Sequence, residues 1–327
     1  MADTFATTNT VLNYSGLVYD TSDTETPLLN ALPRYNVNHD RFPLTVDYAT
    51  GTASQPEITE KASLTAPEAA IVSRPQTYNV TQIIHKATGV SYKKLSNMGA
   101  MSGLNIANQE AAIQNELDFQ VGVKAQEIRN DIEYTIINGV FAESTSDETA
   151  NKTRGFIEAI GSKTTVAASK TPELTPDLIA DCMQKLYEAN APTGGLVLLC
   201  SAVQKRQLSK YFSKENGFLL PNSRNVGGVA IDEIITDFGT LGVMMHKRVP
   251  NGTALIVNLS VCRNVDLDVP GIGIFFYEEL ARTGAGIKGQ LFGQWGLDYG
   301  PSWYHGKITG LATSYTPKEY DSATPIA

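Results

Sequence analysis

The sequence predicts an α+β protein built around one very long helix and an extended β-hairpin. Residues 104–138 lack proline and carry apolar residues at helical spacing. Residues 41–90 contain two extended apolar segments separated by a long polar connection. Residues 175–257 alternate short helical and strand-like patterns, which is typical of a compact α/β unit.

The apolar residues of the long helix recur every three or four positions, so they form one stripe. Its expected core residues are Ile113, Leu117, Val121, Ile128, Ile132 and Ile136, with Ala125 between them. Charged residues, Glu116 and Glu133 among them, are expected on the other faces, and Gly139 is a plausible stop. About 35 residues at ~1.5 Å each give a rod of roughly 50 Å. A compact chain of this size is about as wide, so we expect an elongated subunit. A coiled coil is the alternative, although the stripe is not a clean heptad.

The N-terminal part predicts a loose arm with one apolar anchor. Thr26 reads as an N-cap, Pro27 as the first helical residue, and Pro33 as the stop after three leucines. A half-buried strand follows at residues 41–48, and Pro43 places it at a sheet edge. A hairpin this long cannot bury its own apolar side chains and needs a neighbour. The expected assembly interface is Phe42, Leu44, Val46, Tyr48, Val80, Ile83 and Ile84.

The remaining chain supplies helix caps and returning strands. Thr175 and Pro176 open one helix, and Ser201 with Gln204 forms a capping box for the next. Strands are expected near residues 195–200, 229–235, 241–249 and 254–257, and alternating residues from 261 to 299 predict strands that return to the long helix. Asp266 and Asp268 alternate with apolar residues, so we expect them on a solvent face.

The composition excludes several protein classes. The net charge of −8 and pI near 5.1 argue against a dedicated nucleic-acid binder, which needs a basic face. The cysteines Cys182, Cys200 and Cys262 are far apart, which favours buried thiols in a reducing compartment. Neither a signal peptide nor an apolar run of ~20 residues is visible, so we expect a soluble, cytosolically made protein.

A search for catalytic or ligand-binding motifs finds none that holds. The four histidines lack partners at metal-ligand spacing. Gly284, Gly286 and Gly289 match G-x-G-x-x-G, but the residues from Ile287 on predict a strand where that motif needs a helix, so a hairpin turn is the better interpretation. We therefore expect no catalytic residue, no cofactor and no metal. An enzyme whose residues are distant in sequence is the alternative.

The order of these elements resembles the HK97-type capsid fold. Short motifs from about Thr26 to Leu311 also resemble a group of major capsid proteins of tailed bacteriophages. These motifs are Pro27-Leu28-Leu29 after Thr26, Asn79-Val-Thr-Gln82-Ile83 before Val90-Ser91, Glu127 to Gly139, Arg154-Gly155-Phe156, Asp237-Phe238-Gly239, Pro250-Asn-Gly252-Thr-Ala-Leu, Ala281-Arg-Thr283-Gly284 and His305-Gly306-Lys-Ile-Thr-Gly310-Leu311.

The resemblance implies a division of the chain. It comprises an N-terminal arm at 1–35, an E-loop hairpin at 36–91, a peripheral domain at 92–170 with a spine helix at about 104–138, an axial domain at 171–268, returning strands of the peripheral domain at 269–315 and a C-terminal tail at 316–327. Because arm and hairpin fill the part before the helix, a separate scaffold protein, or none, is implied.

The implied function is a non-enzymatic subunit that self-assembles into hexamers and pentamers of an icosahedral virion shell. Portal, scaffold and decoration proteins are implied partners, with non-specific contact to packaged DNA and no membrane contact. Synthesis in the host bacterial cytoplasm is implied as well. The alternatives are an encapsulin-like compartment shell, another virion structural protein such as a tail or baseplate component, and a soluble α/β enzyme.

Overall fold

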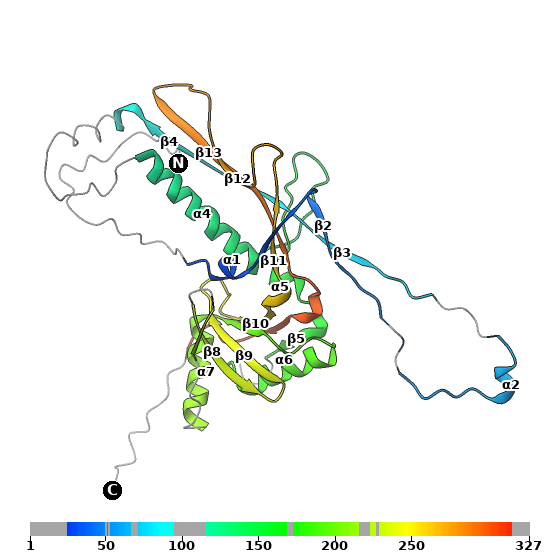
Figure 1. Cartoon of the computed structure of the whole chain (residues 1–327). Helices are drawn as coiled ribbons and strands as arrows, with labels where there is room; N and C mark the ends of the chain where they lie inside the picture. The colour runs from blue at the N-terminus through cyan, green and yellow to red at the C-terminus, as the bar shows by residue number, and fades with distance from the viewer. Residues whose placement is uncertain are drawn as a thin grey trace, which may run out of the picture.

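The computed structural model describes residues 25–49, 51, 53–66, 71–94, 116–168, 173–215, 223–226 and 229–315. Figure 1 shows two sheets, a long helix lying along the smaller one, and a two-stranded arm that projects far from the body. The described part is α+β and extended in shape, as the sequence predicts.

The long helix α4 (Glu116–Asn138) carries the predicted stripe. Ile128, Ile132 and Ile136 are buried, whereas Leu117 and Val121 are half-buried. The expected residues 104–115, including Ile113, lie outside the described residues. Within the described part, α4 packs on strands of the smaller sheet and on two short helices, not on a second long helix. Within the subunit, the apolar stripe of α4 therefore packs on a sheet and does not form a coiled coil.

The smaller sheet is organised around its longest strand, β13 (Gly286–Asp298). One edge of β13 pairs antiparallel with β4 (Gln82–Ser91) over ten residues. The other edge pairs with β12 (Phe275–Glu279) and then with β11 (Arg263–Leu267). β11 pairs in parallel with β1 (Arg34–Val37). The face of β13 that carries Trp295 and Leu297 shares one core cluster with Ile132 of α4, so the returning strands do pack on the long helix.

The glycines of β13 make room for aromatic rings. A Cβ at Gly289 would collide with the ring of Tyr277, and a Cβ at Gly293 with the ring of Phe275. Glycine in a strand often marks such a close approach. The segment before β13 is a hairpin turn closed by Leu280 N, which donates to Lys288 O at 2.8 Å. The hairpin turn expected at Gly284, Gly286 and Gly289 is confirmed, because strand β13 and not a helix follows Gly284.

The larger sheet has both of its faces covered. Its strands run in the order β5 (Thr165–Ala167), β14 (Gly306–Thr309), β10 (Thr253–Asn258), β6 (Leu196–Cys200), β9 (Gly239–Met245), β8 (Val229–Thr236) and β7 (Ser223–Val226). Ile256 and Leu198 face the helix α6 (Pro176–Glu188), whereas Leu255 and Leu199 join the core around the end of α4. Alternate residues of one strand therefore tie the two cores together.

Two of the three predicted helix caps form side-chain hydrogen bonds, whereas Thr26 forms none to the helix that follows it. Thr175 Oγ1 accepts from Leu178 N at 3.3 Å at the start of α6, behind Pro176. At the start of α7 (Ala202–Glu215), Gln204 Oε1 accepts from Ser201 N at 3.1 Å. The remaining short elements are α1 (Pro27–Ala31), β2 (Arg41–Val46), α2 (Glu60–Ser63), β3 (Gln76–Val80), α5 (Phe156–Ala159), η2 (Ser162–Thr164), η3 (Leu259–Val261) and η4 (Ser302–Tyr304).

The strand pairing departs from the expected division of the chain in several places. β4 belongs to the body sheet, so only β2 and β3 form the hairpin expected over residues 36–91. β11 lies inside the expected axial segment but pairs in the smaller sheet. β14 lies among the expected returning strands but pairs in the larger sheet. Pairing between distant strands decides membership of a sheet, and local patterns do not report it.

Two glycines hold the end of α4 against the following chain. Gly155 N donates to Gly139 O at 2.9 Å. A Cβ at Gly155 would lie 2.6 Å from Gly139 N and 2.5 Å from Thr135 O, closer than packed atoms approach. α4 ends at Asn138, so Gly139 is the stop that the sequence predicts. Gly139 has no positive φ, so its role at this stop is close backbone contact.

Replacing Gly155 with alanine should lower the free energy of unfolding by about 1–3 kcal/mol, because two backbone segments must separate. Gly122, exposed on α4 with no atom within 4 Å of a Cβ, is the matched control. Gly122→Ala should raise stability by about 0.5–1 kcal/mol. Urea unfolding of both variants measures the difference, and equal stabilities would contradict the close contact.

Candidate assembly surfaces

A buried carboxylate, Glu133 of α4, joins three separate parts of the chain. Its side chain is 0% exposed. Glu133 Oε1 accepts from Leu28 N at 2.9 Å, and Oε2 accepts from Leu29 N at 2.8 Å. As the sequence predicts, Glu133 lies on a face of α4 other than the apolar stripe, but this face is buried. The stripe of α4 faces the smaller sheet, while Glu133 faces α1 and the chain after β9.

The third partner of Glu133 is the imidazole of His246. His246 Nδ1 accepts from Arg248 N at 3.1 Å, so the neutral ring carries its proton on Nε2. That N–H donates to Glu133 Oε1 at 2.7 Å. Thr26 does not cap α1 with its side chain; its Oγ1 instead accepts from Arg129 at 3.3 Å. Glu133 thus caps α1 from a distance of 104 or more residues in sequence.

Glu116 is also buried, contrary to the expectation from the sequence. Its carboxylate pairs with Lys94 Nζ and accepts from Gln120 Nε2 at 2.8 Å. The ion pair joins Lys94, in the segment that follows β4, to the first residue of α4. A buried carboxylate with a cationic partner and a hydrogen bond is compatible with the fold.

The arm formed by β2 and β3 is fixed firmly at its base. Asn79 Nδ2 donates to Leu297 O at 2.8 Å, and Asn79 Oδ1 accepts from Arg154 N at 2.9 Å. Tyr78 Oη donates to Glu143 Oε2 at 3.0 Å, and Arg41 stacks over the Tyr78 ring at 4.1 Å. Because these contacts tie the base to the body, the direction of the arm is set by the subunit itself.

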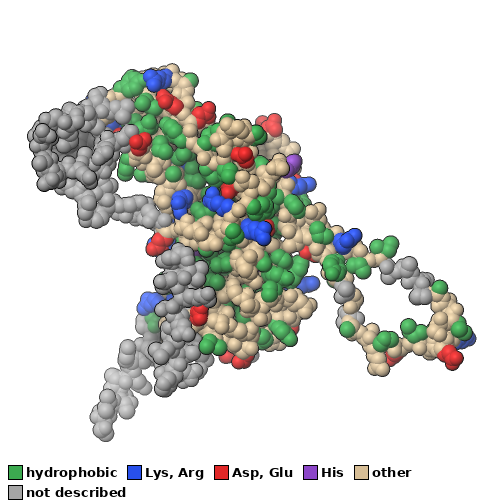
Figure 2. All heavy atoms as spheres, in the orientation of Figure 1, with side chains coloured by type: hydrophobic (Ala, Val, Ile, Leu, Met, Phe, Trp, Pro, Cys, Tyr) green, Lys and Arg blue, Asp and Glu red, His purple; other side chains and the backbone are tan. Residues whose placement is uncertain are grey.

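Beyond its base the arm exposes large apolar side chains. Ile58 is 74% exposed, Leu64 85% and Ile71 94%. Figure 2 shows apolar side chains spread along this projecting loop, away from the body. The sequence predicted only a polar connection between the two extended segments, so these three residues were not among the expected interface residues. The only sign of their role in the sequence was that single large aliphatic residues stand in a polar stretch without periodicity.

The expected interface residues divide into two groups. Phe42, Val80 and Ile84 are buried within the subunit, so the expectation that they contact a neighbour is corrected. Phe42 packs against Gly296, and its strand begins at the body. The other residues are at the surface: Val46, Tyr48 and Ile83 are exposed and Leu44 is half-buried. Alternation alone could not tell where the strand leaves the core.

Asp266 is a third carboxylate that is unexpectedly buried. The sequence suggested a solvent face, but Asp266 is 1% exposed because β11 lies between β1 and β13. Its oxygens accept no hydrogen bond within the described residues, and Arg34 Nη1 lies 3.6 Å away. Burial raises the pKa of Asp266, and the Arg34 charge lowers it by less. Asp268 is exposed, as expected.

The described residues contain no group of three or more His, Cys, Asp or Glu that could hold a metal. Cys182, Cys200 and Cys262 are all buried, as expected, and the described residues contain no disulfide. Burial raises the pKa of the Cys182 thiol to about 12, and that of Cys262 is also raised. These thiols are therefore poor nucleophiles. Across the same residues, no helix has the length and apolarity needed to cross a bilayer.

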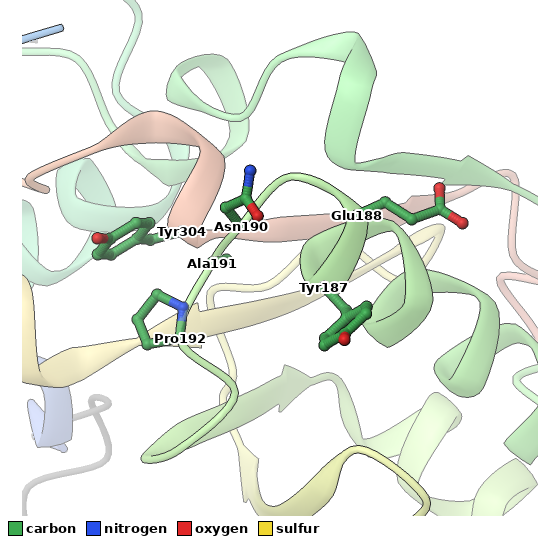
Figure 3. A pocket seen from close by; sticks show the side chains of 6 residues that line it. All are labelled: Tyr187, Glu188, Asn190, Ala191, Pro192 and Tyr304. Carbon is green, nitrogen blue, oxygen red and sulfur yellow. The ribbon is translucent and has the colours of Figure 1, made fainter. Parts of the chain in front are cut away.

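A hollow at the end of α6 is lined by Tyr187, Glu188, Asn190, Ala191, Pro192 and Tyr304. In Figure 3 the carboxylate of Glu188 points away from the Tyr304 ring. Glu188 accepts from Gln184 Nε2 at 2.8 Å, and Tyr187 packs near Phe238 with ring centres 6.1 Å apart. One carboxylate engaged in a helix-surface hydrogen bond does not form an acid–base pair.

The family model of the SU10 major capsid protein matches residues 1–312. The chain belongs to this family of major capsid proteins. The capsid protein is therefore a structural subunit of a phage shell, and its place is the virion. No curated protein matches the sequence.

Solved capsid-type structures share the fold of the capsid protein. The SrpI encapsulin complex from Synechococcus elongatus PCC 7942 is 12% identical, with 94% of this chain and 96% of that chain covered and a TM-score of 0.64. The capsid of cyanophage A-1(L) is 12% identical, with 92% and 97% covered and a TM-score of 0.61. The capsid of a native GTA particle is 12% identical, with 94% and 96% covered and a TM-score of 0.56. The HK97-like capsid fold is confirmed.

Replacing Glu133 of the capsid protein with alanine should lower the free energy of unfolding by about 3 kcal/mol, because three buried donors lose their acceptor. Asp131 is the control: it lies on the same helix, is exposed, and pairs with Lys86 at 2.7 Å. Asp131→Ala should cost no more than about 1 kcal/mol. Chemical denaturation of free subunits compares the two free energies of unfolding. A loss of stability in Glu133→Ala as small as that of the control would contradict the stabilising role of the buried Glu133 carboxylate.

Proposed function

We propose that this capsid protein forms the hexamers and pentamers of an icosahedral shell around phage DNA, without enzymatic activity. Membership in the capsid family supports assembly with copies of itself. The described residues present neither a metal cluster nor an acid–base pair in the hollow beside α6. What the described part of the subunit does present is exposed apolar surface on the arm, which a neighbouring subunit can cover.

The exposed apolar residues of the arm are the observation that carries this proposal. Ile58, Leu64 and Ile71 cannot reach the body of their own subunit, because the arm is fixed pointing away from it. Full burial of one aliphatic side chain contributes about 1.5–3 kcal/mol. Three such residues per subunit provide a substantial driving force, part of which the ordering of the loop offsets. A neighbouring subunit is the surface on which we place them.

Val46 and Tyr48 extend the same contact surface toward the base of the arm, since both are exposed.

The division of the body into peripheral and axial domains is part of the proposal, with the arm as E-loop. Portal, scaffold and decoration proteins are further proposed partners. With a net charge of −8, contact with packaged DNA is non-specific and weak. Synthesis takes place in the host cytoplasm.

The combined change Ile58→Ser, Leu64→Ser and Ile71→Ser should leave a folded subunit that assembles poorly. The three side chains contribute little to the free subunit, where they are exposed, and much to a covered interface. The concentration needed for assembly should rise at least about tenfold. Sedimentation velocity and negative-stain microscopy measure it.

The matched control changes three polar residues of the same loop, Ser54→Ala, Gln55→Ala and Ser73→Ala, and should assemble as the unmodified chain does. If the serine variant forms shells at the same concentration as this control, the arm does not bind a neighbour through these residues.

An encapsulin-like compartment is the second candidate, favoured by the TM-score of 0.64 with the SrpI encapsulin complex. Purified native particles distinguish the two. We expect nuclease-protected DNA of uniform length inside them, measured by gel electrophoresis after capsid disruption. Particles that hold a single protein cargo and no DNA would favour the compartment.

A further inference from the structure

The outer edge of β4 turns an ordered row of backbone groups away from the subunit. β4 pairs with β13 on one side only. Tyr92 N donates to Ala285 O at 3.1 Å and continues this ladder, which fixes its phase. In an antiparallel ladder, alternate residues bond to the partner. The even-numbered residues 82–90 therefore bond to β13, and the odd-numbered residues 83–91 turn their N–H and C=O groups outward.

These outward groups are unsatisfied. Within the described residues, no backbone hydrogen bond reaches Ile83, His85, Ala87 or Gly89 from outside β13. The side chains beside this edge are open as well: Ile83 is 64% exposed, and His85 and Ala87 are exposed. Among the even-numbered residues, by contrast, Ile84, Thr88 and Val90 are buried, and Lys86 pairs with carboxylates of α4.

The edge of β4 also lacks the features by which proteins usually protect an open strand, such as proline, bulges and outward charges. No proline lies between residues 82 and 91, and the ladder with β13 shows no register shift. The one lysine, Lys86, turns toward α4, where Nζ lies 2.7 Å from Asp131 and 3.8 Å from Glu127.

The other edge strands are protected or short. β2, in the two-stranded arm, contains Pro43 and a register shift, and β12 ends in Glu278 and Glu279. β1 and β7 span four residues each, and β5 spans three. Among these edges, β4 alone is long, regular and free of outward charge. Such an edge pairs with another strand by β-addition.

We propose that β4 binds a strand of a neighbouring copy of this chain along its outer edge. The subunit assembles with its own kind, so a second copy is the partner available at every position of the shell. The edge is also continuous with the arm, because β3 leads into β4 through Thr81 alone. Ile83 lies at this junction and adds apolar area to the paired edge. The inference rests on self-assembly and not on the contacts at the tip of the arm.

Hydrogen exchange resolved at single amides tests the pairing. In free subunits, the amides of Ile84, Lys86 and Thr88 should exchange slowly, because they bond to β13, and those of His85, Ala87 and Gly89 rapidly. In assembled shells, the second group should slow at least about tenfold. Fast exchange of these amides in shells would overturn the proposal. So would slow exchange already in free subunits, since the edge would then be covered within one chain.

A proline at Ala87 tests the same edge by assembly. Ala87 turns its N–H outward, so Ala87→Pro removes an outward donor and no bond to β13. Ala87→Ser keeps the N–H and is the matched control. We expect both variants to fold with the same circular dichroism spectrum, and only the proline variant to require at least about tenfold more protein to assemble.

Normal assembly of folded Ala87→Pro subunits would overturn strand addition. If that variant fails to fold, the exchange measurement on the unmodified chain decides alone. Because Ala87→Pro leaves the arm intact, its result is independent of the serine variant of the arm. Loss of assembly in one variant and not in the other identifies which of the two proposals fails.

Discussion

The buried carboxylate of Glu133 is the contact on which the arrangement of the subunit depends. A carboxylate in the interior is tolerated only when several donors satisfy it. Here the donors come from the two first free amides of α1 and from His246 after β9. The hydrogen bonds of Glu133 therefore hold the N-terminal anchor and the larger sheet at the same point of α4. Asn138 Nδ2 adds a second tie, donating to Arg248 O at 2.9 Å.

This internal satisfaction contrasts with what the subunit leaves open. The base of the arm uses Asn79 and Tyr78 to fix its direction, yet its distal residues have no apolar surface of their own to cover them. Within the described residues, the edge of β4 likewise has a regular set of backbone groups without hydrogen-bond partners. We propose that association with neighbouring copies completes both the apolar burial and the backbone pairing. A shell subunit differs in this way from an enzyme, whose unsatisfied groups converge on a pocket.

Several local predictions were confirmed because their causes are local. The stripe of α4 follows from helical periodicity, and Thr175 and Gln204 cap helices through residues three positions away. The edge position of β2 follows from Pro43, which has no N–H to donate. The candidate interface was predicted less well. Phe42 and Val46 alternate alike in sequence, but Phe42 packs against Gly296 across the fold, whereas Val46 lies where the arm has left the body.

By itself, the sequence determined the α+β class, the long amphipathic helix, the caps and the existence of a hairpin that needs a neighbour. Tertiary structure alone decided which charges are buried: Glu133 and Asp266 look like surface residues because their partners are far away along the chain. It also decided that β4 belongs to the body and presents an open edge. Strand pairing and burial depend on contacts between distant residues, and local periodicity carries no information about which strands will meet.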